Sequence, residues 1–74
     1  MNIKQQKKEI EDALVDALNQ CTAVLAHIEQ QYEKACEASA NETDEQYKNR
    51  RQMYTDIIEV SLLTGRIVNA LNAF

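Results

Sequence analysis

The chain has 74 residues and a formal net charge of −4, and it contains one glycine, no proline and no tryptophan. A chain of this length forms one domain, residues 1–74, with a small core, and a sheet protein of this size would need glycine and proline for its turns. The composition therefore predicts an all-α protein, and the negative charge disfavours general binding to nucleic-acid phosphates.

The first predicted helix covers residues from about 3 to 38. Asn2 is a suitable N-cap, because its side chain can accept hydrogen bonds from the first free amides. Apolar residues then recur at helical spacing and form one stripe that covers roughly a third of the circumference. The pattern predicts an amphipathic helix with a single buried face, made by Ile3, Ile10, Leu14, Ala17, Leu18, Cys21, Val24, Leu25, Ile28, Tyr32 and Ala35.

The stretch EASANETDEQ interrupts this helix at residues 37–46. Its serine, asparagine and threonine side chains compete for backbone hydrogen bonds and so favour turns and caps. Thr43 and Gln46 have the spacing of a capping box, which predicts a second helix from about 44 to 73. Since the connection is short, the two helices should pack as an antiparallel hairpin.

The second helix carries more apolar surface than one neighbouring helix can cover. Its apolar and small residues form two stripes, and the first helix offers only one stripe against them. The first stripe consists of Tyr47, Tyr54, Ile57, Ser61, Thr64, Val68 and Leu71. The second stripe consists of Val60, Leu63, Ile67, Ala70 and Phe74. We expect the second stripe to have no partner within the chain and to mark an interface.

No pattern of catalysis, of a metal site or of a cofactor site stands out. His27 is the only histidine, and no convergent set of three or four ligands surrounds it as zinc would need. Cys21 and Cys36 would lie about 22 Å apart on one helix, which is too far for a disulfide. We expect both thiols to be reduced and partly buried, and we expect a protein that is not an enzyme.

Three other features have alternative interpretations. The segment KNRR at residues 48–51, with Tyr47 and Tyr54, could stack on and bind nucleic acid, but acidic neighbours dilute its charge. The apolar segment 57–74 contains Glu59 and Arg66, which argues against membrane insertion, and the polar start of the chain predicts no signal peptide. Gly65 lies inside the second helix, either as a tolerated defect or where another helix approaches closely.

The stretch EQYKNRRQMYTDIIEVSLLTGRIVNAL, residues 45–71, resembles the small E component of type III secretion needle chaperones. A Gln-Tyr pair opens the helix, polar turns follow, and aliphatic residues then dominate. The resemblance implies a two-helix hairpin of the bacterial cytoplasm. It also implies a helical-repeat partner, with which the hairpin keeps the needle subunit unpolymerised until export. The second half of the chain carries the resemblance, and the first helix matches only in being amphipathic.

These features predict a protein-binding module, with an interface on the second helix. A partner would lie along it as helix-in-groove recognition requires. The alternative is a self-assembling hairpin, in which two copies form a homodimeric four-helix bundle of coiled-coil type. Such bundles occur in small regulatory, phage or plasmid proteins. A secreted hairpin of the WXG kind would need a Trp-x-Gly turn, which is missing. The predicted interface residues are Tyr47, Tyr54, Ile57, Ile58, Val60, Leu63, Ile67, Ala70, Leu71 and Phe74.

Overall fold

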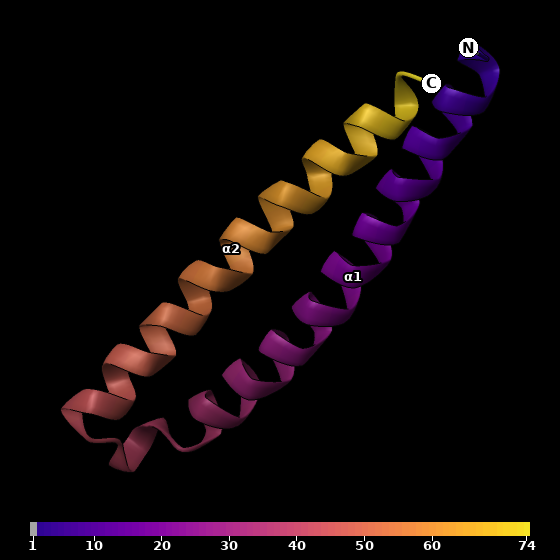
Figure 1. The fold of residues 1–74 in the computed structure, drawn as a ribbon. Coiled ribbons are helices and arrows are strands. Elements are labelled where there is room, and N and C mark those ends of the chain that lie inside the picture. Colours follow the sequence, from indigo (N-terminus) through magenta and orange to yellow (C-terminus); the bar gives the residue numbers. More distant parts are fainter. Residues whose placement is uncertain (1) are drawn as a thin grey trace.

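A computed structural model describes residues 2–74 and confirms the predicted helical hairpin (Figure 1). Helix α1 covers Ile3–Glu37, a short 3-10 turn η1 covers Ser39–Asn41, and helix α2 covers Asp44–Asn72. The two long helices run antiparallel, so that both ends of the chain lie at the same end of the rod. The predicted boundaries agree with the observed ones to within about one residue.

Side-chain caps fix where the helices begin. The Asn2 side chain accepts hydrogen bonds from the amides of Lys4 and Gln5, at 3.1 and 3.4 Å. At the start of α2 the predicted capping box is present: the Gln46 amide donates to Thr43 Oγ1 at 3.2 Å, and the Thr43 amide donates to Gln46 Oε1 at 2.8 Å. These bonds satisfy amides that would otherwise lack partners at a helix start.

The two helices meet along a narrow seam with alternating spacings of three and four residues. This average of 3.5 residues keeps one face of each helix turned toward the other, as in a coiled coil. The seam residues of α1 are half-buried and comprise Leu14, Leu18, Cys21, Leu25, Ile28, Tyr32 and Ala35. The seam residues of α2 are Met53, Ile57, Val60, Thr64, Ile67 and Leu71.

The seam of α2 corrects one sequence-based prediction. It takes Ile57, Thr64 and Leu71 from the predicted first stripe. It also takes Val60 and Ile67 from the second stripe, which was predicted to have no partner within the chain. For these two residues that prediction is wrong. A straight helical wheel separates the stripes, whereas a contact with a period of 3.5 residues runs between them and uses both.

The hairpin is a thin rod with little interior. Its extents are 60 × 16 × 14 Å, and Ile67, which is 8% exposed, is the one buried residue among residues 2–74. The accessible surface is 5992 Å², whereas a compact protein of 8.5 kDa would expose about 4,700 Å². The hairpin therefore exposes roughly 1,300 Å² more surface than a compact protein of the same mass.

Candidate protein-binding surfaces

Large apolar side chains remain exposed along both helices. On α1 they are Ile3, Ile10, Val15 and Val24, with exposed fractions from 41% to 67%. On α2 they are Tyr47, Tyr54, Ile58, Leu62, Leu63, Val68 and Phe74, with exposed fractions from 39% to 60%. Patches of this kind on a small protein usually mark sites of protein association. Their positions around the two helices divide most of them between two surfaces.

The first surface lies on a flank of α2 beside the seam, where the Tyr54 ring lies 6.0 Å from that of the seam residue Tyr32 between centroids. We call it the outer ridge, and it consists of Tyr47, Tyr54, Ile58, Leu62 and Val68. Tyr54 and Leu62 are the most exposed of them, at 55% and 60%. The first four follow one another at intervals of seven, four and four, so they share one side of the helix, whereas Val68 lies about 120° around the helix from Leu62 at 100° per residue. The outer ridge is therefore continuous from Tyr47 to Leu62.

Gly65 lies on the same side of α2 as the outer ridge, one turn beyond Ser61. A Cβ atom at this position would meet no atom of α1 within 4 Å. The glycine therefore leaves room that α1 does not use. Gly65 is therefore not a point at which α1 approaches α2 closely.

The second surface is a groove between the two helices, which we call the apolar groove. Its volume is about 430 Å³. Helix α1 lines it with Ala17, Gln20, Cys21 and Val24, and α2 with Val60, Leu63 and Ile67. Leu63 and Val24 are about half exposed there, at 48% and 49%. Because these residues line one groove, stretch 17–24 of α1 lies opposite stretch 60–67 of α2.

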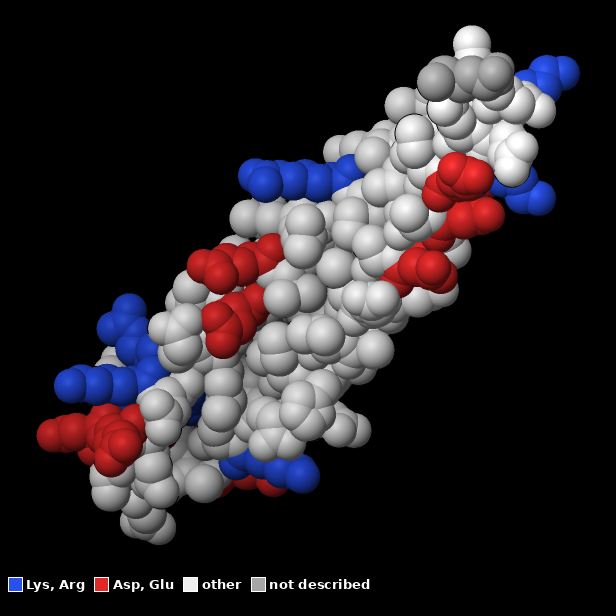
Figure 2. Space-filling model, in the orientation of Figure 1, with Lys and Arg blue, Asp and Glu red and all other residues white. Residues whose placement is uncertain are grey.

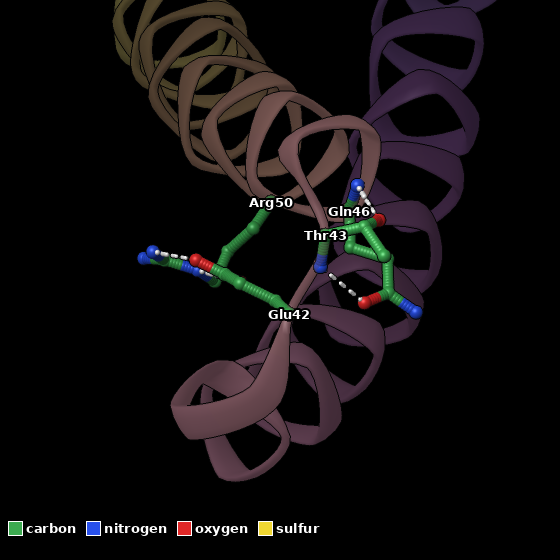
Figure 3. Close-up of polar contacts among 4 residues, drawn as sticks. All are labelled: Glu42, Thr43, Gln46 and Arg50. Atoms are coloured by element: carbon green, nitrogen blue, oxygen red, sulfur yellow. Dashed lines mark hydrogen bonds and ion pairs between the residues drawn. The ribbon is translucent and has the colours of Figure 1, made fainter.

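The turn end of the rod holds an ion pair between Glu42 and Arg50 (Figure 3). Arg50 donates two hydrogen bonds, from Nε to Glu42 Oε2 at 3.0 Å and from Nη2 to Glu42 Oε1 at 2.8 Å. The side chains are only 22% and 15% exposed for Arg50 and Glu42 respectively. The pair ties the loop before α2 to the second turn of that helix, as two parallel bonds of this type fix a geometry well.

Tyrosine and arginine side chains gather beside this ion pair. The rings of Tyr32 and Tyr54 lie 6.0 Å apart between centroids, and the Arg50 and Arg51 guanidinium groups lie 5.2 and 5.9 Å from the Tyr47 ring centre. A side-chain hydrogen bond with Cys36, and then burial, raise the pKa of Tyr32. Arg50 is thus already engaged by Glu42 and Tyr47, which leaves less of segment 48–51 for a phosphate than the sequence suggested.

The ion pair predicts how stability depends on pH. The hydrogen bonds from Arg50, and then its charge, hold the pKa of Glu42 below its usual value, against the effect of burial. A carboxyl whose pKa is lower in the folded state stabilises the fold above its unfolded pKa of about 4.3, and loses this effect as the pH falls through the folded pKa. We expect Glu42→Gln to lower the thermal midpoint at neutral pH and to have little effect in acid.

Thermal unfolding of the wild type and Glu42→Gln, followed by circular dichroism from about pH 7 to about pH 2, measures this difference. The control is Arg50→Gln, in which the further change Glu42→Gln should have almost no effect at any pH. A gap between the wild type and Glu42→Gln that stays constant into acid would contradict this role of the carboxylate.

The structure divides the predicted interface residues into two classes. Ile57, Val60, Ile67 and Leu71 belong to the seam, and Ala70 is half-buried beside it. The exposed ones separate by surface: Tyr47, Tyr54 and Ile58 lie on the outer ridge, Leu63 lines the apolar groove, and Phe74 is 53% exposed at the end of the chain.

Sequence reasoning missed several exposed apolar residues. Leu62, at 60% exposed, belonged to neither predicted stripe. Val68 was placed in a stripe but not in the interface. Ile3 and Ile10 were assigned to the buried face of the first helix, yet they are 67% and 52% exposed. The element lengths explain this last error, since α1 has 35 residues against 29 in α2 and the start of α1 has less helix beside it.

The structure also places the single histidine and the two cysteines that the sequence offered as candidate site residues. His27 is exposed, Cys21 is partly buried and Cys36 is exposed rather than partly buried, and both thiols are free. Within residues 2–74, no three histidine, cysteine, aspartate or glutamate side chains lie together as a metal ion would need. No helix in this part of the chain is long and apolar enough to cross a membrane.

Comparison with known proteins finds no relative of this chain. No protein-family model, no curated protein and no solved structure matches the chain. The two apolar surfaces and the turn-end cluster are therefore interpreted from their own geometry.

Proposed function

We propose that the hairpin is a non-enzymatic protein-binding module, which holds a helical partner against the outer ridge of α2. The observation that carries this proposal is the contrast between the one buried residue among residues 2–74 and a row of exposed apolar side chains on one helix. Exposed aromatic and aliphatic residues in a row, at helical spacing, fit the groove of a partner built from helices. Tyr47 and Tyr54 add large rigid rings of the kind that anchor interfaces.

The resemblance of residues 45–71 gives this module a more specific role. A cytoplasmic co-chaperone of a bacterial type III secretion system would work with a helical-repeat protein and keep the needle subunit soluble before export. A hairpin whose own core is thin suits this role, because docking covers apolar surface of both chains. Gly65 fits as well, since the open space at its Cβ position lets a partner helix approach α2 closely.

The experiment is co-expression of the chain with the helical-repeat protein and the needle subunit of its own host, followed by measurement of the purified complex. We expect the wild type to form a soluble complex and Leu62→Asp to weaken it at least about tenfold, because the charge would be buried without a partner. Leu63→Asp is the matched control, since Leu63 is the adjacent residue, is similarly exposed and lines the apolar groove instead.

The outcomes separate the general proposal from its specific form. A host without a type III secretion system, or an unaltered needle subunit that stays soluble without this chain, would overturn the co-chaperone role. A complex that tolerates Leu62→Asp but is lost with Leu63→Asp would remove the outer ridge as the binding surface. Both substitutions lie at exposed positions, and unchanged helix content by circular dichroism shows that each variant remains folded.

A further inference from the structure

One charged residue lies within the row of apolar side chains on α2. Starting from Tyr47, positions 51, 54, 58 and 62 follow at intervals of four, three, four and four. At 100° per residue these positions all lie within about 80° of one another around the helix. Position 51 is Arg51, which is exposed and lies one turn from both Tyr47 and Tyr54. A helix that covers the outer ridge from Tyr47 to Leu62 therefore also covers Arg51.

The guanidinium of Arg51 has no carboxylate partner within the described part of the chain. The one ion pair among residues 2–74 joins Glu42 to Arg50. Arg51 lies against the Tyr47 ring instead, with its guanidinium carbon 5.9 Å from the ring centre. A ring face attracts a cation, but it leaves the N–H donors of the guanidinium free for an oxygen acceptor.

The surface beside Arg51 offers hydrogen-bond donors and aromatic rings together. A hollow of about 320 Å³ is lined by Tyr32, Tyr47, Arg50, Arg51, Tyr54 and Thr55. This lining contains no carboxylate, and Glu42 already binds Arg50 through two hydrogen bonds. Arg51 therefore supplies the guanidinium of this hollow that is still available to an acidic group.

Acidic residues near the hollow restrict the kind of anion that fits. On α2, Asp44 lies two turns before Arg51 and lines a neighbouring hollow with it. On α1, Glu29 and Glu33 lie within one turn of Tyr32. Figure 2 shows basic side chains at the turn end of α2 with acidic ones close to them. A strand of phosphates would run past these carboxylates, whereas a single carboxylate can meet Arg51 alone.

The other charged residues in this part of α2 lie outside the row. Lys48 lies about 60° around the helix from Arg51, and Asp56 lies about 140° from it. Asp56 also accepts a hydrogen bond from Gln52 at 2.9 Å. Asp44 lies beyond the end of the row, at the first residue of α2. Arg51 is thus the one charged residue in the row from Tyr47 to Leu62.

A partner helix on this row must satisfy the charge that it covers. A guanidinium removed from water without a partner costs several kcal/mol, and a carboxylate matches its planar set of donors with two parallel hydrogen bonds. Tyrosine and arginine are also the residue types that supply much of the affinity at interfaces. The sequence of tyrosine, arginine and tyrosine at one-turn spacing therefore favours a partner with a complementary acidic group.

We propose that the helix bound to the outer ridge carries one aspartate or glutamate whose carboxylate binds the guanidinium of Arg51. This inference rests on the proposed function and specifies the chemistry of the partner at the same surface. Apolar residues one turn to either side of the carboxylate contact Tyr47 and Tyr54. The contact with Leu62 lies about 16 Å farther along the helix. The partner helix is thus amphipathic, with its one acidic contact residue near one end of the apolar stripe.

The test is selection of helices that bind the purified chain from a displayed library. Each member is a single amphipathic helix, with the positions of one face randomised among apolar, acidic, amide and basic residues. We expect the selected helices to carry aspartate or glutamate at one position near the end of an otherwise apolar face. Replacing this residue with its amide should weaken binding at least about tenfold.

The substitution Arg51→Met tests the same contact from the side of this chain. Methionine keeps an unbranched side chain but removes the charge, so it leaves the carboxylate of a bound helix without a partner. We expect binding of the selected helices to weaken at least about tenfold. The matched control is Lys48→Met, which removes an equal charge outside the row and should change the affinity by less than about threefold. Arg51→Glu should recover binding to a helix with lysine at the acidic position.

The outcomes separate this inference from the proposed function. Loss of binding in Leu62→Asp but not in Arg51→Met overturns the carboxylate contact and leaves the outer ridge as a binding surface. Contact positions that select no acidic residue have the same consequence. Selected helices that tolerate Leu62→Asp, or a library that yields no binder, overturn the outer ridge as well.

A single-stranded oligonucleotide added as a competitor tests the phosphate alternative. If it displaces the selected helices and loses this effect in Arg51→Met, then Arg51 binds phosphate and the proposal is overturned. We expect no displacement, because the chain has a net charge of −4. Unchanged helix content by circular dichroism shows that each surface variant remains folded.

Discussion

Replacing Ile67 with aspartate is expected to unfold the hairpin. Ile67 is 8% exposed and is the one buried residue among residues 2–74. Truncation of a buried isoleucine to alanine costs about 2–5 kcal/mol, and a buried carboxylate without a partner adds to that cost. A core in a chain this short supplies no more than about 3–5 kcal/mol. The substitution therefore removes most or all of the stability.

Far-ultraviolet circular dichroism during heating measures this effect. The Ile67→Asp variant should lose the cooperative transition and much of the helix signal. The matched control is Val68→Asp, the adjacent residue, which is 39% exposed and lies on the outer ridge. We expect this control to unfold cooperatively near the wild-type midpoint. If Ile67→Asp behaved like Val68→Asp, the seam would lie on another face of α2.

Replacing Gly65 with alanine is expected to stabilise the hairpin. Gly65 lies within α2, has no positive φ angle and leaves open space where a Cβ would stand. Alanine in an exposed helix interior is more favourable than glycine by about 1 kcal/mol, chiefly through backbone entropy. For a chain of this size that gain corresponds to a rise of roughly 4–8 °C in the midpoint.

Thermal unfolding of Gly65→Ala at a fixed protein concentration measures the gain. Asn69→Ala is a useful reference, because it changes another exposed position of the same helix from a polar residue to alanine and should have a smaller effect. A midpoint that falls in Gly65→Ala would show that another chain occupies the space beside Gly65 in the purified protein.

The elements of this fold follow from local signals that one sequence can carry. The absence of proline, the single glycine and the recurring apolar residues predict two long helices. The capping box between Thr43 and Gln46 predicts where the second helix begins, and the structure contains it. These signals depend on residues within one or two helical turns, so they do not require knowledge of the packing between the helices.

The choice of the buried face could not be predicted in the same way. Val60 and Ile67 alternate with Ile57, Thr64 and Leu71 in the seam, although a straight helical wheel assigns them to different stripes. Thr64 in particular is half-buried, and its hydroxyl donates to the Val60 carbonyl oxygen at 2.8 Å, so its polar group is satisfied within the helix. Which apolar residues are left exposed depends on this seam and on the unequal helix lengths.

We propose that this hairpin is incomplete alone and that another chain covers its exposed apolar surface. Thermal unfolding over a roughly hundredfold range of protein concentration tests it most directly, because association stabilises the folded state by mass action. We predict a midpoint that rises with concentration and rises further when the helical partner is added. A monomer with a high midpoint that neither concentration nor partner changes would contradict the account.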